Sequence, residues 1–222
     1  MPAANNAAAK NTAAKNSAAG RRPRIVLASQ SPSRAGILRS GGIDPVLAPA
    51  GVDEEAIRAS LPDASPAEVV AALARSKAQA VAGQHAADYA GDVVIGGDSM
   101  LLLGGQLQGK PHTRAATVER WRAQAGRTAH LLTGHCVLFG GEEFVETAST
   151  TVHFAAAEEA DIEAYAATGE PLECAGAFTL EALGGWFIDG IEGDPSSVIG
   201  LSLPVVRRAL YSFGLRVADF WG

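Results

Sequence analysis

The chain of 222 residues has few cysteines, few aromatic side chains and no long apolar run. Cys136 and Cys174 stand far apart and in no metal-binding or redox spacing, so we expect free thiols in a reducing compartment, the cytoplasm. Because no apolar run could span a bilayer and no secretory signal is present, we expect no membrane association. A net charge of −6 argues against nonspecific binding of nucleic acid and favours a small-molecule partner. The five histidines show no metal-ligand spacing, and we expect them to be structural or surface residues.

The first 22 residues differ in composition from the rest of the chain. They repeat Ala, Asn and Lys, and no large apolar side chain follows the initial methionine. Such a segment cannot bury enough apolar surface to order itself, so we expect residues 1–22 to form a disordered low-complexity tail. The whole chain is 47% hydrophobic, which is enough for residues 23–222 to bury the core of a single domain.

Strand and helix signals alternate after the tail. The apolar run 25–27 predicts a short strand, and Ser31 and Pro32 are typical of the N-cap and first residue of a helix that ends near Gly41. Further strands are predicted at residues 45–50, in a hairpin from 93 to 111, and at 130–139 and 144–154. Further helices are predicted from the Ser65–Glu68 capping box, from Thr113, from about Glu158 and from Leu203, with an extended Gly-rich region at about 170–200. The alternation predicts an α/β fold with a mixed sheet.

An arginine follows the first predicted strand in an unusual position. Arg34 would lie in the first turn of its helix, where the positive end of the helix dipole disfavours a cation unless an anion compensates. The free N–H groups of that turn and Arg34 together suit a phosphate group. On the turn alone, a capped helix with a solvated arginine is the simpler interpretation.

Asp98 ends the apolar strand VVIGGD, and packing does not explain an aspartate there. We expect the two glycines before it to let a ligand approach. The segment 104–110, GGQLQGK, satisfies the phosphate-loop pattern until Pro111, which stands where Ser or Thr would bind magnesium. We therefore interpret this segment as a hairpin turn, whose Lys110 is either a phosphate contact or a solvated lysine.

Several short motifs, in register, carry a family resemblance. In chain order they are SQSPSR, VDE, ALARSKA, GGDSM, GKP, TGH, TTVHF, AYAATGEPLECAGAF and GGWFIDGIEGDPSSVIGLSLP. From about residue 24 to 214 the chain resembles the Maf family of nucleoside triphosphate pyrophosphatases. The resemblance implies an elongated mixed β-sheet flanked by helices, with two lobes around a central cleft, related in architecture to the inosine triphosphate pyrophosphatases. It also implies hydrolysis of nucleoside triphosphates, a divalent cation (Mg²⁺, or Mn²⁺), a cytoplasmic location and, in many members, a homodimer.

The resemblance also assigns roles to single residues. Asp98 would be the catalytic base that activates water toward the α-phosphorus, and Glu54 and Asp98 would hold the metal. The positions that would bind the triphosphate and its pyrophosphate leaving group are Ser29, Ser31, Arg34, Lys77 and Lys110.

Three positions are expected to select the base, namely Ser33, Ser99 and Glu181. The family turn usually reads Ser-Pro-Arg-Arg, and Ser33 replaces the first arginine. The branch that acts on thymidine and uridine triphosphates carries Arg, Thr and Gln at these positions, and the 7-methylguanosine triphosphate branch carries Glu at the third. An ionised Glu181 only accepts hydrogen bonds and therefore matches the two donors of a guanine edge. We expect guanine-type substrates to lead by a modest margin over a broad range of triphosphates, because the small Ser33 loosens discrimination.

Two alternatives compete with the pyrophosphatase. A phosphate-loop hydrolase or kinase would need residues 104–110 to wrap phosphates. A non-catalytic nucleotide-binding regulator of cell division would hold the nucleotide without turning it over. The presence of Asp98, Glu54, Lys77 and Lys110 together favours turnover, in a nucleotide house-cleaning role with an effect on cell division.

Overall fold

The computed structural model describes residues 21–222, so residues 1–20 of the expected tail lie outside the described part. Arg21 contacts the domain, because its Nη2 lies 2.9 Å from Oδ1 of Asp92. Asp92 is buried and also binds Arg24, at 2.7 Å. A buried carboxylate is costly without cationic partners, which explains why this segment lies against the end of the sheet.

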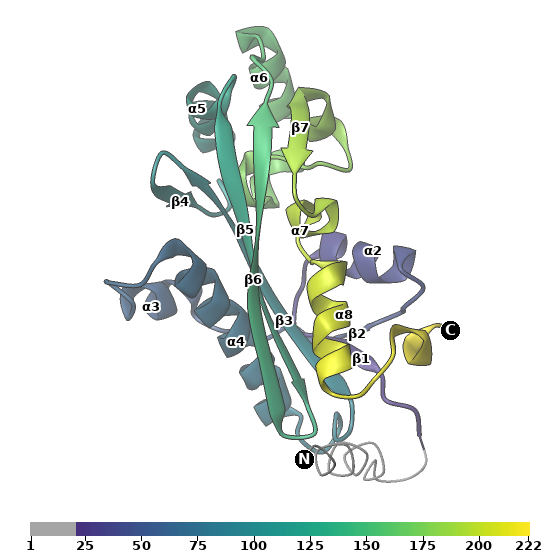
Figure 1. Ribbon diagram of the computed structural model, residues 1–222. Helices are drawn as coiled ribbons and strands as arrows, with labels where there is room; N and C mark the ends of the chain where they lie inside the picture. The colour runs from purple at the N-terminus through teal and green to yellow at the C-terminus, as the bar shows by residue number, and fades with distance from the viewer. Residues whose placement is uncertain (1–20) are drawn as a thin grey trace, which may run out of the picture.

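A mixed sheet of seven strands forms the centre of the fold. The strands are β1 (Ile25–Leu27), β2 (Val46–Leu47), β3 (Val93–Leu103), β4 (Gln106–Gln108), β5 (Thr128–Phe139), β6 (Glu142–Phe154) and β7 (Ile188–Glu192). Their order is β2-β1-β3-β5-β6-β7, and β4 pairs with β3. β1 is parallel to β2 and β3, and the other pairs are antiparallel. The long strands β3, β5 and β6 run along most of the molecule (Figure 1).

Helices cover both faces of this sheet. They are α2 (Pro32–Ser40), α3 (Glu54–Ala59), α4 (Pro66–Gln84), α5 (Arg114–Gln124), α6 (Glu159–Ala167), α7 (Pro195–Ile199) and α8 (Leu203–Ser212). The 3-10 segments are η2 (Glu170–Glu173), η3 (Ala175–Ala177), η4 (Leu183–Phe187) and η5 (Val217–Phe220). The predicted caps are confirmed, since Ser31 caps α2 and Ser65 and Glu68 form a capping box on α4. Within residues 21–222, no helix has both the length and the apolar character needed to cross a membrane.

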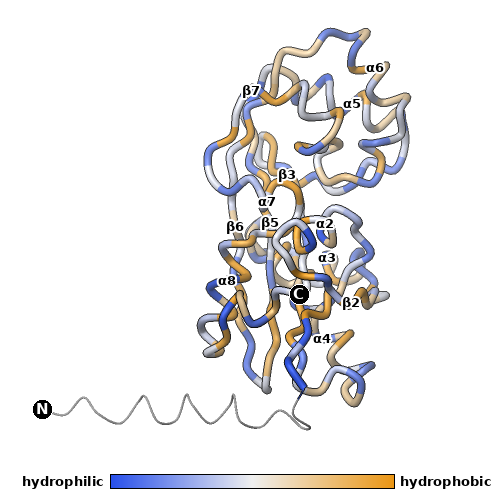
Figure 2. The backbone as a smooth tube through the Cα atoms, turned by 90° about the vertical axis from the view of Figure 1, so that its right-hand side faces the viewer, coloured by the Kyte–Doolittle hydropathy of each residue, from blue (hydrophilic) through white to orange (hydrophobic). Residues whose placement is uncertain are grey.

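The core is divided between two lobes, which Figure 2 shows one above the other. In the lobe with α5, α6 and β7, Trp121 is fully buried, its ring meets Phe154 and Tyr165 edge-on, and its N–H donates to the Ala177 carbonyl at 2.7 Å. In the other lobe, α2 and α8 cover one face of the sheet and α4 covers the opposite face (Figure 1). The predicted α/β class, with an elongated mixed sheet and flanking helices, is confirmed.

The region 170–200 differs from the extended backbone that we expected. It contains η2, η3, η4, β7 and α7. Each of these elements is too short to show a hydrophobic period, and positive φ angles at Gly169 (81°) and Gly176 (71°) turn the chain between them. The acidic turn after residue 52 likewise continues into the short helix α3.

A buried histidine joins β5 to the start of α8. The Nε2 atom of His135 accepts a hydrogen bond from the Ser202 amide at 2.8 Å, and its Nδ1 lies 3.3 Å from the Glu146 carbonyl. The side chain is fully buried, and this burial lowers the pKa of His135 to about 4. The expected structural role of this histidine is confirmed by its burial and its hydrogen bonds to two other elements. The lowered pKa keeps it neutral in the folded protein at pH 7.

This burial predicts a loss of stability in mild acid. The unfolded chain protonates His135 near its usual pKa of about 6.5, while the folded protein resists protonation down to about 4. The free energy of unfolding should therefore fall by about 2 kcal/mol, from this residue alone, between about pH 7 and pH 5. Urea unfolding of wild type and His135→Gln at both pH values measures it, with His130→Gln, exposed on the same strand, as control. An equal pH dependence in wild type and His135→Gln would contradict the prediction.

Candidate active site

The candidate site lies at an interruption of one sheet edge. β3 pairs with β1 at residues 93–95 and with β4 at residues 101–103, on the edge opposite β5. On that edge, no strand of residues 21–222 pairs with residues 96–100, which we call the unpaired stretch. Successive side chains of a strand point to opposite faces, so Asp98 faces α4 and Ser99 faces α2.

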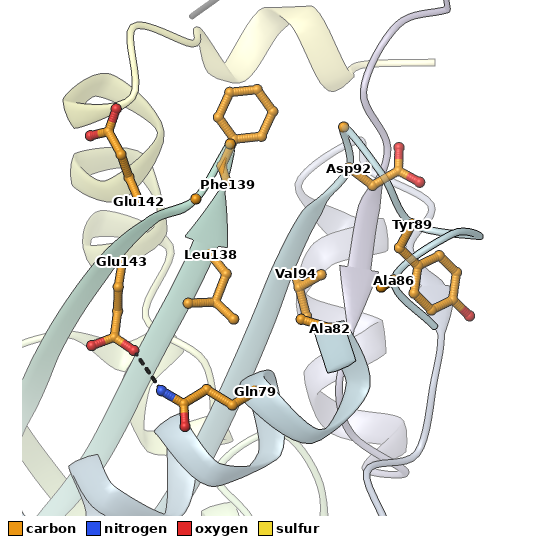
Figure 3. A pocket seen from close by; sticks show the side chains of 13 residues that line it. Gln79, Ala82, Ala86, Tyr89, Asp92, Val94, Leu138, Phe139, Glu142 and Glu143 are labelled. Atoms are coloured by element: carbon orange, nitrogen blue, oxygen red, sulfur yellow. Dashed lines mark hydrogen bonds between the residues drawn. The ribbon is translucent and has the colours of Figure 1, made fainter. Parts of the chain in front are cut away.

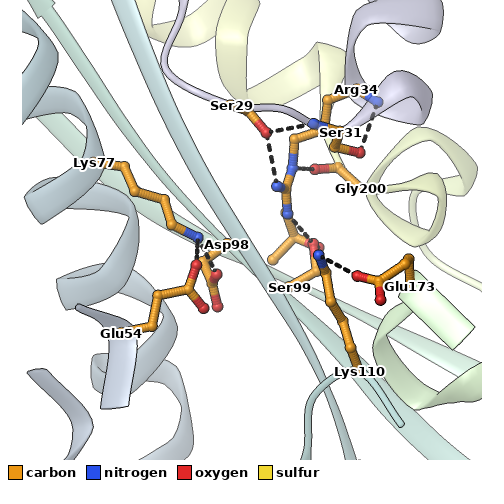
Figure 4. Close-up of polar contacts among 11 residues, drawn as sticks. Ser29, Ser31, Arg34, Glu54, Lys77, Asp98, Ser99, Lys110, Glu173 and Gly200 are labelled. Atoms are coloured by element: carbon orange, nitrogen blue, oxygen red, sulfur yellow. Dashed lines mark hydrogen bonds and ion pairs between the residues drawn. The ribbon is translucent and has the colours of Figure 1, made fainter. Parts of the chain in front are cut away.

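On the α4 face, one ammonium group joins two carboxylates. The Nζ atom of Lys77 lies 2.6 Å from Oδ1 of Asp98 and 2.7 Å from Oε1 of Glu54 (Figure 4). Lys77 and Asp98 are buried, while the Glu54 side chain is about half exposed. Glu54 begins α3, whose N-cap Asp53 accepts from the Ala56 amide at 2.9 Å. The predicted residues Glu54, Lys77 and Asp98 therefore meet.

The pKa values of the two carboxylates are shifted in opposite directions from their ordinary values. Burial raises the pKa of Asp98, and the nearby charges of Lys77 and Arg34 only partly oppose it. Burial also opposes ionisation of Glu54, but the hydrogen bond and charge of Lys77 outweigh it and lower the pKa of Glu54. Burial thus makes Asp98 more basic than an ordinary aspartate, which suits a proton acceptor.

On the α2 face, three hydrogen bonds hold the guanidinium of Arg34. Its Nε donates to the Gly200 carbonyl at 2.7 Å, Nη1 to Ser29 Oγ at 3.3 Å and Nη2 to Ser99 Oγ at 3.0 Å (Figure 4). Burial lowers the pKa of Arg34, and the charges of Asp98 and Glu54 oppose that shift. A guanidinium stays protonated even so, which leaves a cation beside the unpaired stretch.

The hydroxyls at the start of α2 point into the turn. Ser31 Oγ accepts from the Arg34 amide at 3.4 Å, and Ser29 Oγ accepts from the Ser31 amide at 3.1 Å. The predicted phosphate-binding set Ser29, Ser31 and Arg34 is thus one connected group.

The two glycines before Asp98 differ in what surrounds them. A Cβ on Gly96 would lie 2.1 Å from the Ala74 carbonyl oxygen of α4, and a Cβ on Gly97 would lie 3.3 Å from Nε of Arg34. The expectation that a ligand approaches here is therefore wrong for Gly96, because the α4 backbone fills that space. For Gly97, whose neighbour is the Arg34 side chain, the expectation stays a prediction. On β5, Gly134 stands opposite Asp98, and its Cβ would lie 2.3 Å from the Val70 carbonyl. The α4 backbone can lie directly on the sheet here, which brings Lys77 within reach of Asp98.

Lys110 lies apart from Lys77, at the end of β4. It is exposed, and its Nζ lies 3.1 Å from Oε2 of Glu173, whose Oε1 is 3.1 Å from Nδ1 of His112. Its charge still helps to lower the pKa of Glu54. We did not predict Glu173 as a site residue, since nothing in its local pattern marks it as the partner of a lysine 63 positions away.

The phosphate-loop alternative is wrong. Gly104 and Gly105, with φ angles of 57° and 83°, form the turn between β3 and β4, and no helix starts from this turn. A phosphate loop must instead open a helix.

The three positions predicted to select the base separate into two groups. Ser33 Oγ donates to Oε1 of Glu181 at 2.9 Å, which joins α2 to the other lobe. Ser99 binds Arg34 and, at 3.0 Å, Thr133 Oγ1. The structure thus places Ser99 beside Arg34, the predicted phosphate ligand, rather than in the Ser33–Glu181 pair. A cavity of about 470 Å³ at the far end of α4 contains none of the predicted site residues, and its Glu143 is bound by Arg75 and Gln79 (Figure 3).

Comparison with known proteins agrees with the motifs. The family model described as Maf-like protein matches residues 24–213. The chain belongs to the Maf family. A nucleoside triphosphate pyrophosphatase of Corynebacterium aurimucosum is 73% identical over 198 residues, 89% of this chain and 98% of that protein. One of Nocardia farcinica is 56% identical over 204 residues, 89% of this chain and 96% of that protein. The solved Staphylococcus aureus Ham1 protein is 18% identical with a TM-score of 0.35, over 61% of this chain and 73% of that chain, a similarity too slight to establish a shared fold.

The two carboxylates at the site of this Maf protein can be compared with the ligands that a divalent cation requires. No group of three or more His, Cys, Asp or Glu side chains in the described residues could hold a metal by itself. Glu54 and Asp98 nevertheless converge on one cation, the Lys77 ammonium. Mg²⁺ is commonly bound by one or two carboxylates together with substrate phosphates, so this pair suits it.

The close contact of α4 with the sheet predicts the effect of a single methyl group. Gly96→Ala should push α4 away from β3 and lower the free energy of unfolding by about 1–3 kcal/mol, the usual cost of overpacking. Gly83→Ala, the same change at an open position of α4, should raise it by about 0.5–1 kcal/mol, because alanine favours the helix. Urea unfolding of both variants tests this, and equal stabilities would contradict the close contact.

Proposed function

We propose that the protein is a nucleoside triphosphate pyrophosphatase, which hydrolyses a nucleoside triphosphate to the monophosphate and pyrophosphate. The observation that carries the proposal is the Lys77–Asp98–Glu54 group beside Arg34 at the unpaired stretch of β3. The name of the Corynebacterium aurimucosum relative, at 73% identity, supports the same reaction.

Asp98 would act as the general base. Its carboxylate takes the proton of a water molecule while the water oxygen forms a bond to the α-phosphorus and the bond to the pyrophosphate oxygen breaks. Burial makes this carboxylate more basic, and the charge and hydrogen bond of Lys77 favour its ionised form. The same burial limits the access of bulk water to hydrogen bonds with the Asp98 carboxylate.

The cations would hold the charges of the triphosphate. Three of the five N–H donors of Arg34 are used within the protein, so two remain for phosphate oxygens. Lys77 has a third donor beyond its two carboxylate partners. Lys110 would exchange Glu173 for the leaving pyrophosphate. Phosphoryl transfer depends mainly on such positioning and charge stabilisation, which these fixed groups supply.

Mg²⁺, or Mn²⁺, is the divalent cation that we propose for Glu54 and Asp98. When bound, it would neutralise charge on the phosphate oxygens and polarise the reacting phosphoryl group. A cytoplasmic location and a homodimer stay predictions from the family resemblance.

Replacing the base tests the mechanism. Asp98→Asn should preserve the fold and most of the nucleotide affinity but lower turnover by about two orders of magnitude or more, the scale of a lost general base. Pyrophosphate release from a panel of nucleotides with Mg²⁺ measures it, and Asp189→Asn, an exposed residue of β7, serves as control. Unchanged turnover would assign the base elsewhere. Nucleotide binding by wild type without any pyrophosphate release would favour the non-catalytic regulator.

The Ser33–Glu181 pair predicts a shift in base preference. A carboxylate at position 181 accepts only, whereas glutamine both donates and accepts and therefore also matches uracil and thymine edges. Glu181→Gln should move relative kcat/KM from guanosine triphosphates toward uridine and thymidine triphosphates by about tenfold. Steady-state kinetics with GTP, 7-methyl-GTP, UTP and dTTP measure it. A strong wild-type preference for the pyrimidines, or an unchanged ranking, would contradict this assignment.

A further inference from the structure

The loop that carries Glu181 has no regular secondary structure of its own. Residues 179–184, which we call the base loop, begin after η3 and enter η4. Glu181 is exposed, with Oε1 bound by Ser33 and Oε2 by the Leu180 amide at 3.1 Å. Since residues 179–182 of the base loop belong to no helix or strand, their position depends on side-chain contacts.

One carboxylate binds both ends of the base loop. At the first end, Glu170 accepts from the hydroxyl of Thr179. At the other end, its Oε2 accepts from the Leu183 amide at 3.2 Å and its Oε1 from the Gly184 amide at 3.1 Å. Tyr165 donates to the same carboxylate at 3.1 Å. Glu170 therefore contacts residues on each side of Glu181 without contacting Glu181 itself.

The two ends of the base loop lie in close contact with each other. A Cβ on Gly184 would lie 2.5 Å from the Thr179 carbonyl oxygen and 2.6 Å from the Tyr165 hydroxyl. Burial opposes ionisation of Glu170, but the hydrogen bonds from Thr179, Gly184, Leu183 and Tyr165 outweigh it and lower its pKa. The carboxylate is thus anionic, and hydrogen bonds to an anion are stronger than those between neutral groups.

The base loop also contacts the phosphate side of the site. Ser33, the partner of Glu181, precedes Arg34 in α2, and the guanidinium of Arg34 is held by Ser29 and Ser99. A shift of the base loop would therefore change the position of Glu181 relative to the bound phosphates, while the Lys77–Asp98–Glu54 group would stay in place on the other face of β3.

We propose that Glu170 is a positioning residue for base selection, which closes the base loop so that Glu181 faces the nucleotide base. The inference rests on the proposed function, since it concerns which triphosphate that site accepts. Glu170 does not touch the substrate, and its effect passes through Glu181.

The test compares Glu170→Ala and Glu170→Gln with wild type, using kcat/KM for GTP and UTP. Glu170→Ala should change the GTP to UTP ratio by about tenfold, mainly through KM for GTP, and Glu170→Gln should change it less because it keeps one acceptor oxygen. Glu163→Gln, on α6 and paired with Arg114, is the control and should leave the ratio unchanged. The double variant Glu170→Ala with Glu181→Gln should show the ratio of Glu181→Gln alone. Additive effects, or an unchanged ratio in Glu170→Ala, would overturn the inference.

A second readout separates positioning from a general loss of structure. Inhibition by inorganic pyrophosphate reports the phosphate side alone, so its inhibition constant should stay within about twofold of wild type in both Glu170 variants. A parallel weakening for pyrophosphate and both nucleotides would show a purely structural role. If wild type released pyrophosphate from no triphosphate, the proposed function would fail. Calorimetry would then compare the affinities of wild type and Glu170→Gln for GTP and UTP. A changed affinity ratio would support the role of Glu170, and an unchanged ratio would overturn it.

Discussion

The contact between Lys77 and Asp98 is the interaction on which the site depends. A carboxylate in the middle of a buried, largely apolar strand is costly unless a cation reaches it, and the Lys77 ammonium lies 2.6 Å from Asp98. That distance requires the α4 backbone to lie directly on β3 and β5, where side chains usually separate a helix from a sheet. Gly96 and Gly134 provide this space, because a side chain at either position would overlap the α4 backbone. The absence of two side chains therefore allows Lys77 to reach Asp98.

Because successive side chains of β3 point to opposite faces, the candidate site residues lie on both faces of the sheet. Asp98 faces α4 and binds Lys77, whereas Ser99 faces α2 and binds Arg34, so adjacent residues of one strand contact cations on opposite faces of the sheet. On one edge of β3, residues 96–100 have no strand partner between β1 and β4 in the described part of the chain. Groups on both faces of the sheet therefore lie next to this open part of the edge. A substrate lying along this edge can reach groups on both faces.

The second lobe contributes carboxylates to this edge. Glu181 accepts a hydrogen bond from Ser33, and Glu173 accepts one from Lys110. Two acidic residues of the second lobe thus provide acceptors for donors at the candidate site. In the function we propose, an anionic triphosphate would compete with Glu173 for the Lys110 ammonium, and a base with hydrogen-bond donors would compete with Ser33 for Glu181. Substrate binding would then change contacts between the lobes.

Local signals in the sequence determined the helix starts at Ser31 and Ser65 and the hairpin turn at Gly104, because caps and turns depend on neighbouring residues. The family motifs also identified Lys77 and Asp98 as site residues, and the structure brings them together. Only the tertiary structure showed that Gly96 lies against the α4 backbone, that Ser99 accepts a hydrogen bond from Arg34, and that Glu170 accepts one from the Leu183 amide of the base loop. These roles depend on residues from different elements of the chain or on loops without a hydrophobic period, and no local pattern encodes such contacts.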